Sequence, residues 1–172
     1  MIANFSNIIL IGMAGAGKST IGRVLAGLSG KQFLDTDDLI TARTGMALQD
    51  FLDQVGSKRF QQLEEQTLLD LNPDNHIIAT GGSAIYSDKG MAHLQTAGPL
   101  VLLDVDLATL KQRVNNETSR GLINPDSGSF NDLYYARKPL YRKWADYRIP
   151  ASSGSPGDIA GVILQRLKNA PA

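Results

Sequence analysis

The stretch Gly12-Met13-Ala14-Gly15-Ala16-Gly17-Lys18-Ser19-Thr20 decides the fold of this chain. It carries the pattern G-x-x-x-x-G-K-[ST] between an apolar run at 8–11 and a helix-period segment at 19–28. Strand, glycine loop and helix in this order are typical of a phosphate-binding loop, because backbone N–H groups and a helix N-terminus together attract an anion. We expect the nucleotide phosphates to be bound by Gly12, Gly15, Ala16, Gly17, Lys18, Ser19 and Thr20, with the Ser19 hydroxyl also a ligand of Mg²⁺.

The composition is that of an ordinary globular protein. The 172 residues fit one domain spanning 1–172, with 42% hydrophobic residues and 17 basic against 17 acidic side chains. This balance argues against a nucleic-acid or membrane-surface partner. The chain has no cysteine, and its N-terminus lacks the features of a signal peptide or membrane span, so we expect a cytoplasmic protein, and we expect a monomer.

Apolar runs of strand length alternate with longer helix-period segments, which is typical of a parallel α/β sheet with helices on both faces. We expect strands near 8–11, 32–34, 76–80, 99–105 and 146–149. The helices are expected over 19–28, 37–71 with a break near Thr44-Gly45, 87–95, 107–114, 130–144, and 159–167 with Asp158 as its cap.

Polar residues gather where the expected strands end. Asp35 and Asp37 follow the second strand and Gly81-Gly82-Ser83 the third, at the edge where open α/β sheets bind ligands. Asp104 ends the fourth strand, either as the acid of a Walker B motif or as a turn residue. The polar segment 115–128 is long for a loop inside a compact domain, so we expect a mobile lid.

Taken together, these features resemble the shikimate kinases, and the resemblance covers nearly the whole chain. The matching stretches are 12–20, 33–37, 77–82, Arg113 with Arg120 seven residues on, and 133–141, which contains Arg137-Lys138-Pro139-Leu140-Tyr141. The resemblance implies a P-loop kinase fold with a five-stranded parallel sheet in the order 2-3-1-4-5. It also implies an ATP- and Mg²⁺-dependent kinase of a small hydroxylated acid, shikimate first.

On the nucleotide side, the resemblance implies that Lys18 and Ser19 hold the ATP phosphates and Mg²⁺. Asp35 would lie near the metal, and Arg113 against the adenine. Arg120 would close from the lid onto the transferring phosphate. Arg120 also has a plainer interpretation as a solvated loop residue.

On the acceptor side, the resemblance implies that Asp37 binds the reacting hydroxyl as base or orienter, which places it with Lys18 and Arg120 among the catalytic residues. Gly81 and Gly82 would donate backbone hydrogen bonds to the acid substrate, and Arg137 would pair with its carboxylate. Two alternatives remain: the aspartates after the second strand can cap a helix, and Arg137 can face solvent.

The chain departs from the family pattern G-E-x-x-F-R-x-x-E, whose arginine binds the substrate carboxylate. Gln61 stands at the arginine position of this substrate-binding segment, while Glu64 retains the final acid. Lys58 is on the better helix face to compensate. Two further departures are Ser83 for the third family glycine and Gly121 for the proline after the lid arginine. Three interpretations follow: a shikimate kinase with a repaired carboxylate site, a kinase of another small alcohol, or a nucleotide-binding module without turnover.

Overall fold

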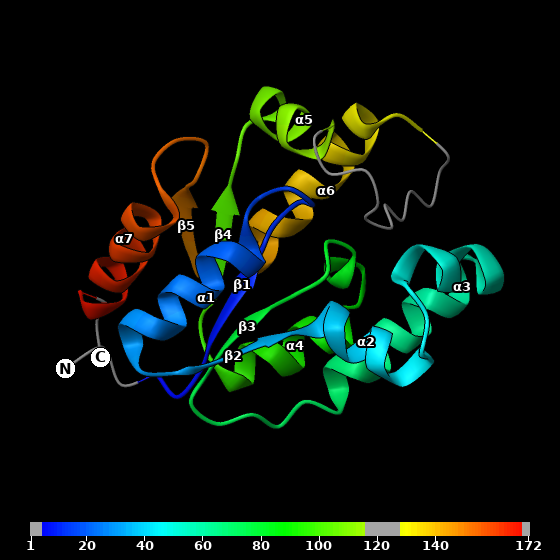
Figure 1. The fold of residues 1–172 in the computed structure, drawn as a ribbon, viewed down its shortest axis with the longest axis horizontal. Coiled ribbons are helices and arrows are strands. Elements are labelled where there is room, and N and C mark those ends of the chain that lie inside the picture. The colour runs from blue at the N-terminus through cyan, green and yellow to red at the C-terminus, as the bar shows by residue number, and fades with distance from the viewer. Residues whose placement is uncertain (1–4, 116–127, 170–172) are drawn as a thin grey trace.

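The computed structural model describes residues 5–115 and 128–169. Within them, each strand is followed by one or two helices, as Figure 1 shows. The strands are β1 (Ile8–Ile11), β2 (Gln32–Asp35), β3 (His76–Ala79), β4 (Leu100–Asp104) and β5 (Tyr147–Pro150). The helices are α1 (Lys18–Ser29), α2 (Thr36–Thr44), α3 (Leu48–Leu69), the short 3₁₀ helix η1 (Ala84–Tyr86), α4 (Asp88–Ala97), α5 (Leu107–Asn115), α6 (Phe130–Trp144) and α7 (Pro156–Lys168).

The five strands form one parallel sheet in the order β2-β3-β1-β4-β5, so the predicted α/β fold and strand order are confirmed. The central strand β1 is buried along its whole length, which explains why its four residues are all apolar. Because the strands run parallel, their carboxyl ends meet at one edge. The loop at 12–17, the start of α2 and the segment 80–83 all leave the sheet at that edge.

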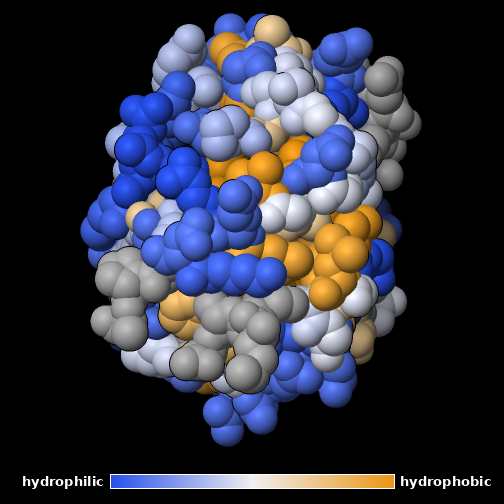
Figure 2. Space-filling view, turned by 90° about the vertical axis from the view of Figure 1, so that its left-hand side faces the viewer, coloured by the Kyte–Doolittle hydropathy of each residue, from blue (hydrophilic) through white to orange (hydrophobic). Residues whose placement is uncertain are grey.

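Helices cover both faces of the sheet (Figure 1). Helices α1 and α7 pack against each other, while α4 packs against α3 and η1. Figure 2 shows the side of the molecule that is on the left in Figure 1, where hydrophobic residues lie between hydrophilic ones. Among the large apolar side chains, Leu28 of α1 and Val162 of α7 are exposed.

The predicted break near Gly45 is confirmed, but α3 contains a second one that was not expected. Gly56 has φ 78° and ψ 163°, so two helical segments meet there at a kink. A small separate core joins α3 to α2 through Ile40, Leu52 and Phe60. The position of α3 beside the sheet therefore depends on its own apolar cluster as well as on the main core.

The last helix starts earlier than expected. Ser155 is the N-cap of α7, Pro156 is its first residue, and Asp158 completes a capping box, so the prediction of Asp158 as the N-cap is wrong by three positions. Serine and aspartate in this spacing satisfy two N–H groups reciprocally.

The lid expected at 115–128 lies almost entirely outside the described residues, as does Arg120. No helix in the described ranges is both long and apolar enough to cross a bilayer.

Candidate active site

The phosphate-binding loop joins β1 to α1 at the centre of the sheet edge. Gly17 is the N-cap of α1 with φ 91°, a conformation that side-chain-bearing residues rarely adopt. The Lys18 ammonium is buried and donates to the carbonyls of Gly12 at 2.6 Å and Met13 at 2.8 Å. The Ala16 N–H donates to Met13 at 3.1 Å, whereas Thr20 is exposed on α1. The loop therefore holds its lysine inside a tight turn of backbone.

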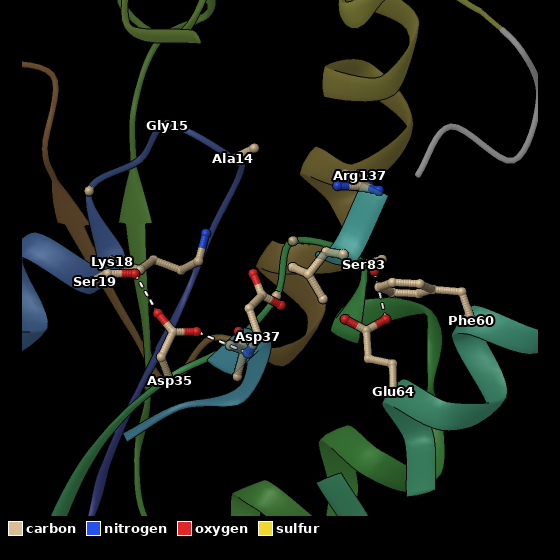
Figure 3. A pocket seen from close by; sticks show the side chains of 15 residues that line it. Ala14, Gly15, Lys18, Ser19, Asp35, Asp37, Phe60, Glu64, Ser83 and Arg137 are labelled. Carbon is tan, nitrogen blue, oxygen red and sulfur yellow. Dashed lines mark hydrogen bonds between the residues drawn. The ribbon is translucent and has the colours of Figure 1, made fainter. Parts of the chain in front are cut away.

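A hollow beside this loop brings together residues from five parts of the chain (Figure 3). Lys18 and Ser19 approach from α1, and Asp35 and Asp37 from the β2–α2 junction. Its other described lining residues are Ala14, Gly15, Gly17, Leu48, Phe60, Glu64, Thr80, Gly81, Gly82, Ser83 and Arg137. Most of the predicted site residues thus share one cavity.

Ser19 and Asp35 form the part of this hollow suited to a metal. The Ser19 hydroxyl donates to Asp35 Oδ2 at 2.5 Å, and Asp35 Oδ1 accepts the Asp37 N–H at 3.0 Å as the N-cap of α2. Asp35 is therefore a helix cap and a candidate metal neighbour at once. Among the described residues no group of three His, Cys, Asp or Glu side chains converges on one point. Two oxygens beside a phosphate loop nevertheless fit Mg²⁺, which keeps several waters and phosphate ligands in such sites.

Arg137 forms the far wall of the hollow. It projects from α6, is only 2% exposed, and its Nε donates to the Tyr86 hydroxyl at 3.4 Å. A Cβ atom built on Gly82 would lie 2.9 Å from Arg137 Nη1, so the absent side chain leaves room for the guanidinium. The alternative in which Arg137 faces solvent is wrong, because a guanidinium is not buried without a structural or binding role.

The two glycines after β3 are held by neighbouring side chains. The Tyr141 hydroxyl donates to the Gly82 carbonyl at 2.6 Å, and burial raises the pKa of Tyr141, so this phenol stays neutral. The Gly81 N–H donates to the Thr36 hydroxyl at 3.0 Å. A hydrogen bond from the Gly81 N–H to the substrate stays a prediction, and forming it would require this N–H to leave the Thr36 hydroxyl. The Gly82 N–H is the other predicted donor.

Glu64 and Ser83 form a pair that sequence reasoning did not connect. The Ser83 hydroxyl donates to Glu64 Oε2 at 2.6 Å, and both side chains are buried. Burial raises the pKa of Glu64 to about 7; the Ser83 hydrogen bond lowers it, Asp37 raises it and Arg137 lowers it. The sequence held one sign of this pair: Glu64 belongs to the segment in which Gln61 replaces the family arginine, and Ser83 itself replaces a family glycine.

Gln61 lies outside this hollow. It is half-buried and lines an adjoining hollow with Lys58, Gln62, Glu64, Glu65, Ser83, Tyr86 and Ser87. The two hollows share the Glu64–Ser83 pair as a wall. Lys58, on the face expected for compensation, lines the same adjoining hollow but is exposed. Contact of Gln61 with a substrate therefore stays a prediction.

Arg113 connects the phosphate-binding loop to the turn after β5. Its guanidinium donates to Gly15 at 3.3 Å from Nη1, and to Ala151 at 3.1 Å and Ser152 at 3.4 Å from Nη2. These bonds fix the arginine between the loop and the turn after β5. The contact of Arg113 with the adenine stays a prediction, and the position of Arg113 beside Gly15 of the phosphate-binding loop is compatible with it.

In the comparison with protein families, the shikimate kinase model matches residues 14–168. The chain belongs to the shikimate kinase family. It is 34% identical over 163 residues to the shikimate kinase of Sulfurihydrogenibium sp. (strain YO3AOP1), covering 94% of this chain and 98% of that one. It is also 35% identical to human threonine synthase-like 1 over 94% of its length, but this covers only 22% of that longer protein.

The solved structures agree. Shikimate kinase from Acinetobacter baumannii in complex with shikimate has a TM-score of 0.85 and 34% identity, covering 96% of this chain and 94% of that one. The protein is therefore an ATP-dependent small-molecule kinase of this family that uses Mg²⁺. The resemblance stated from the residues alone is confirmed.

Proposed function

We propose that this kinase transfers the γ-phosphoryl group of ATP to a hydroxyl of shikimate. The observation that carries the proposal is the shared hollow, which sets Asp37 and Arg137 beside the phosphate loop. A carboxylate suits a hydroxyl donor and a buried guanidinium suits a carboxylate, and shikimate carries both groups. The similarity to an enzyme bound to shikimate supports the same acceptor.

In the proposed reaction, the acceptor oxygen attacks the γ-phosphorus, and the bond to the β–γ bridging oxygen breaks to release ADP. The hydroxyl proton passes to Asp37, or Asp37 orients the hydroxyl without taking it. Lys18 offsets charge on the phosphates. Mg²⁺, held near Ser19 and Asp35, would neutralise further phosphate charge when bound. Arg120 is proposed to approach the transferring phosphate.

The substrate side of the proposal uses Arg137, the Gly82 N–H and Asp37. Gly81 and Gln61 are proposed neighbours of the acceptor, and Arg113 a neighbour of the adenine. Gln61 favours a second candidate, a related small hydroxylated acid, because an amide binds a carboxylate less tightly than an arginine by on the order of 1 kcal/mol or more.

An ADP-release assay on the purified protein tests the proposal. It compares shikimate with a panel of hydroxy acids and polyols at equal concentrations, after subtraction of hydrolysis without acceptor. Release that depends on shikimate is expected. Release with another panel compound alone would identify the second candidate, and release with none would indicate a nucleotide-binding protein without turnover.

A further inference from the structure

Glu64 carries an unused hydrogen-bonding atom at the acceptor side of the site. Its side chain is 2% exposed, and Oε2 accepts the Ser83 hydroxyl. In residues 5–115 and 128–169, Oε1 has no hydrogen-bond partner although it is buried. Buried polar atoms are nearly always paired, so an unpaired one in the wall of a binding hollow indicates a role for a ligand.

The geometry around Gly81 shows where this atom lies. A Cβ atom built on Gly81 would be 2.6 Å from Glu64 Oε1 and 2.7 Å from Asp37 Oδ1. Two acid side chains thus converge on one backbone position, and Figure 3 shows both of them in the wall of the hollow. When two carboxyl groups are this close, the more deeply buried one tends to keep a proton. The pKa of Glu64, raised to about 7 mainly by burial, agrees with this.

We propose that Glu64 acts as a neutral carboxylic acid, donating a hydrogen bond from Oε1 to an acceptor oxygen that lies over Gly81. Ser83 is the positioning residue, because its hydroxyl occupies Oε2 and leaves Oε1 as the oxygen that carries the proton. The inference deepens the proposed function and rests on it. In this proposal Glu64 takes over the hydrogen-bond donation that the family arginine would provide, and Gln61, which lines the adjoining hollow, does not.

Other ionisable groups face Glu64 and must be considered in a pH test. Asp37 raises the pKa of Glu64 and Arg137 lowers it. The other ionisable side chains that line the two hollows are Lys18, Asp35, Lys58, Glu65 and Tyr86, and Tyr141 interacts with Glu64 from α6. No histidine is among them, since His76 and His93, the two in the chain, line neither hollow.

The test measures shikimate binding by calorimetry without nucleotide, so that phosphate titration does not contribute. If only the neutral form of Glu64 donates, a pKa of about 7 predicts that Kd rises about tenfold from pH 6 to pH 8. Glu64→Gln keeps a donor that cannot ionise, so its Kd should change little over this range. Glu65→Gln is the matched control on the same helix and should keep the wild-type profile, because Glu65 is not among the groups that shift the pKa of Glu64.

Ser83→Ala separates positioning from packing. Because the Ser83 hydrogen bond lowers the pKa of Glu64, its removal should move the midpoint of the binding profile to higher pH. An unchanged midpoint would remove Ser83 from the proposal. A flat wild-type profile would show that binding does not depend on the proton of Glu64, and much weaker binding in Glu64→Gln at pH 6 would show that an amide donor cannot replace it; either result overturns the inference.

Infrared titration of the protein without substrate gives an independent measure. A carboxylic-acid C=O band should disappear between pH 6 and pH 8 in the wild type and be missing in Glu64→Gln. Absence of that band in the wild type overturns the inference even if shikimate is phosphorylated. Presence of the band with no ADP release on shikimate would instead refute the proposed acceptor and leave the proton on Glu64 established.

Discussion

The buried Glu64 also makes the free energy of unfolding depend on pH. The folded pKa is raised from 4.5 to about 7, so the folded protein holds this proton more tightly than the unfolded chain does. Its stabilising contribution is complete below pH 4.5 and is lost as the pH rises through 7.

Between pH 5.5 and pH 8 the wild type should therefore lose on the order of 2 kcal/mol more free energy of unfolding than Glu64→Gln does. Urea unfolding at the two pH values measures the difference. Equal losses in the two proteins would mean that Glu64 titrates normally in the folded state.

Asp37 gives the sharpest catalytic prediction. Asp37→Asn keeps the shape of the side chain but removes the carboxylate that is proposed to bind the reacting hydroxyl. Turnover should fall by at least about 100-fold, a typical size for a lost general base, while ATP binding changes little. Coupled ADP assays and nucleotide titrations measure both. Asp38→Asn, one residue along α2, serves as the control, and unchanged turnover in Asp37→Asn would exclude Asp37 from the chemistry.

At the residue scale, the sequence predicts what is local. Lys18, Ser19 and Asp35 come together in one hollow because the elements that carry them follow one another along the chain, and because β1 and β2 both pair with β3. The Glu64–Ser83 bond spans 19 residues and joins α3 to the turn after β3, so no local pattern reveals it. Burial of Arg137 likewise depends on α6 packing over that turn.

At the element scale, the kink in α3 determines how this helix reaches the site. Gly56, at φ 78° and ψ 163°, occupies a backbone region that is essentially limited to glycine. Phe60 and Glu64 follow the kink and line the hollow, and Phe60 also joins Leu52 and Ile40 in the small core. The helical period of α3 predicted its apolar positions, but it carried no sign that the axis turns at Gly56.

Gly56→Ala should lower the free energy of unfolding by about 1–3 kcal/mol, because an alanine there is strained although nothing lies within 4 Å of its Cβ. Gly27→Ala in α1 is the control, since Gly27 also has open space around it but no positive φ. That change should stabilise by up to about 1 kcal/mol. Equal effects of the two substitutions would contradict the assigned backbone strain at Gly56.

For the whole molecule, the two edges of the parallel sheet have different roles: one edge carries the proposed binding site and the other holds loops together. The hollow lies at the carboxyl edge, and side chains at the opposite edge fix loops to one another: Lys31, which precedes β2, donates to the Ser6 carbonyl at 3.0 Å and to Asn75 Oδ1 at 3.1 Å. The alternation of strand-length and helix-period segments predicted a parallel α/β sheet, and the strand order followed from the resemblance to the shikimate kinases. The meeting of Arg113 with the turn after β5 could not be predicted, since it joins residues 38 positions apart.

The difference between the two edges of the sheet predicts that Lys18, and not Lys31, controls nucleotide binding. Mg²⁺ and ADP at 100 times the Kd should stabilise the protein by about 2.7 kcal/mol, a rise in Tm of roughly 5–10 °C for a chain of this size. Lys18→Ala should lose most of that rise, because it removes the buried ammonium of the loop. Lys31→Ala should lower the starting Tm but keep the rise, and differential scanning fluorimetry measures both. The reverse pattern would place the nucleotide at the other edge of the sheet.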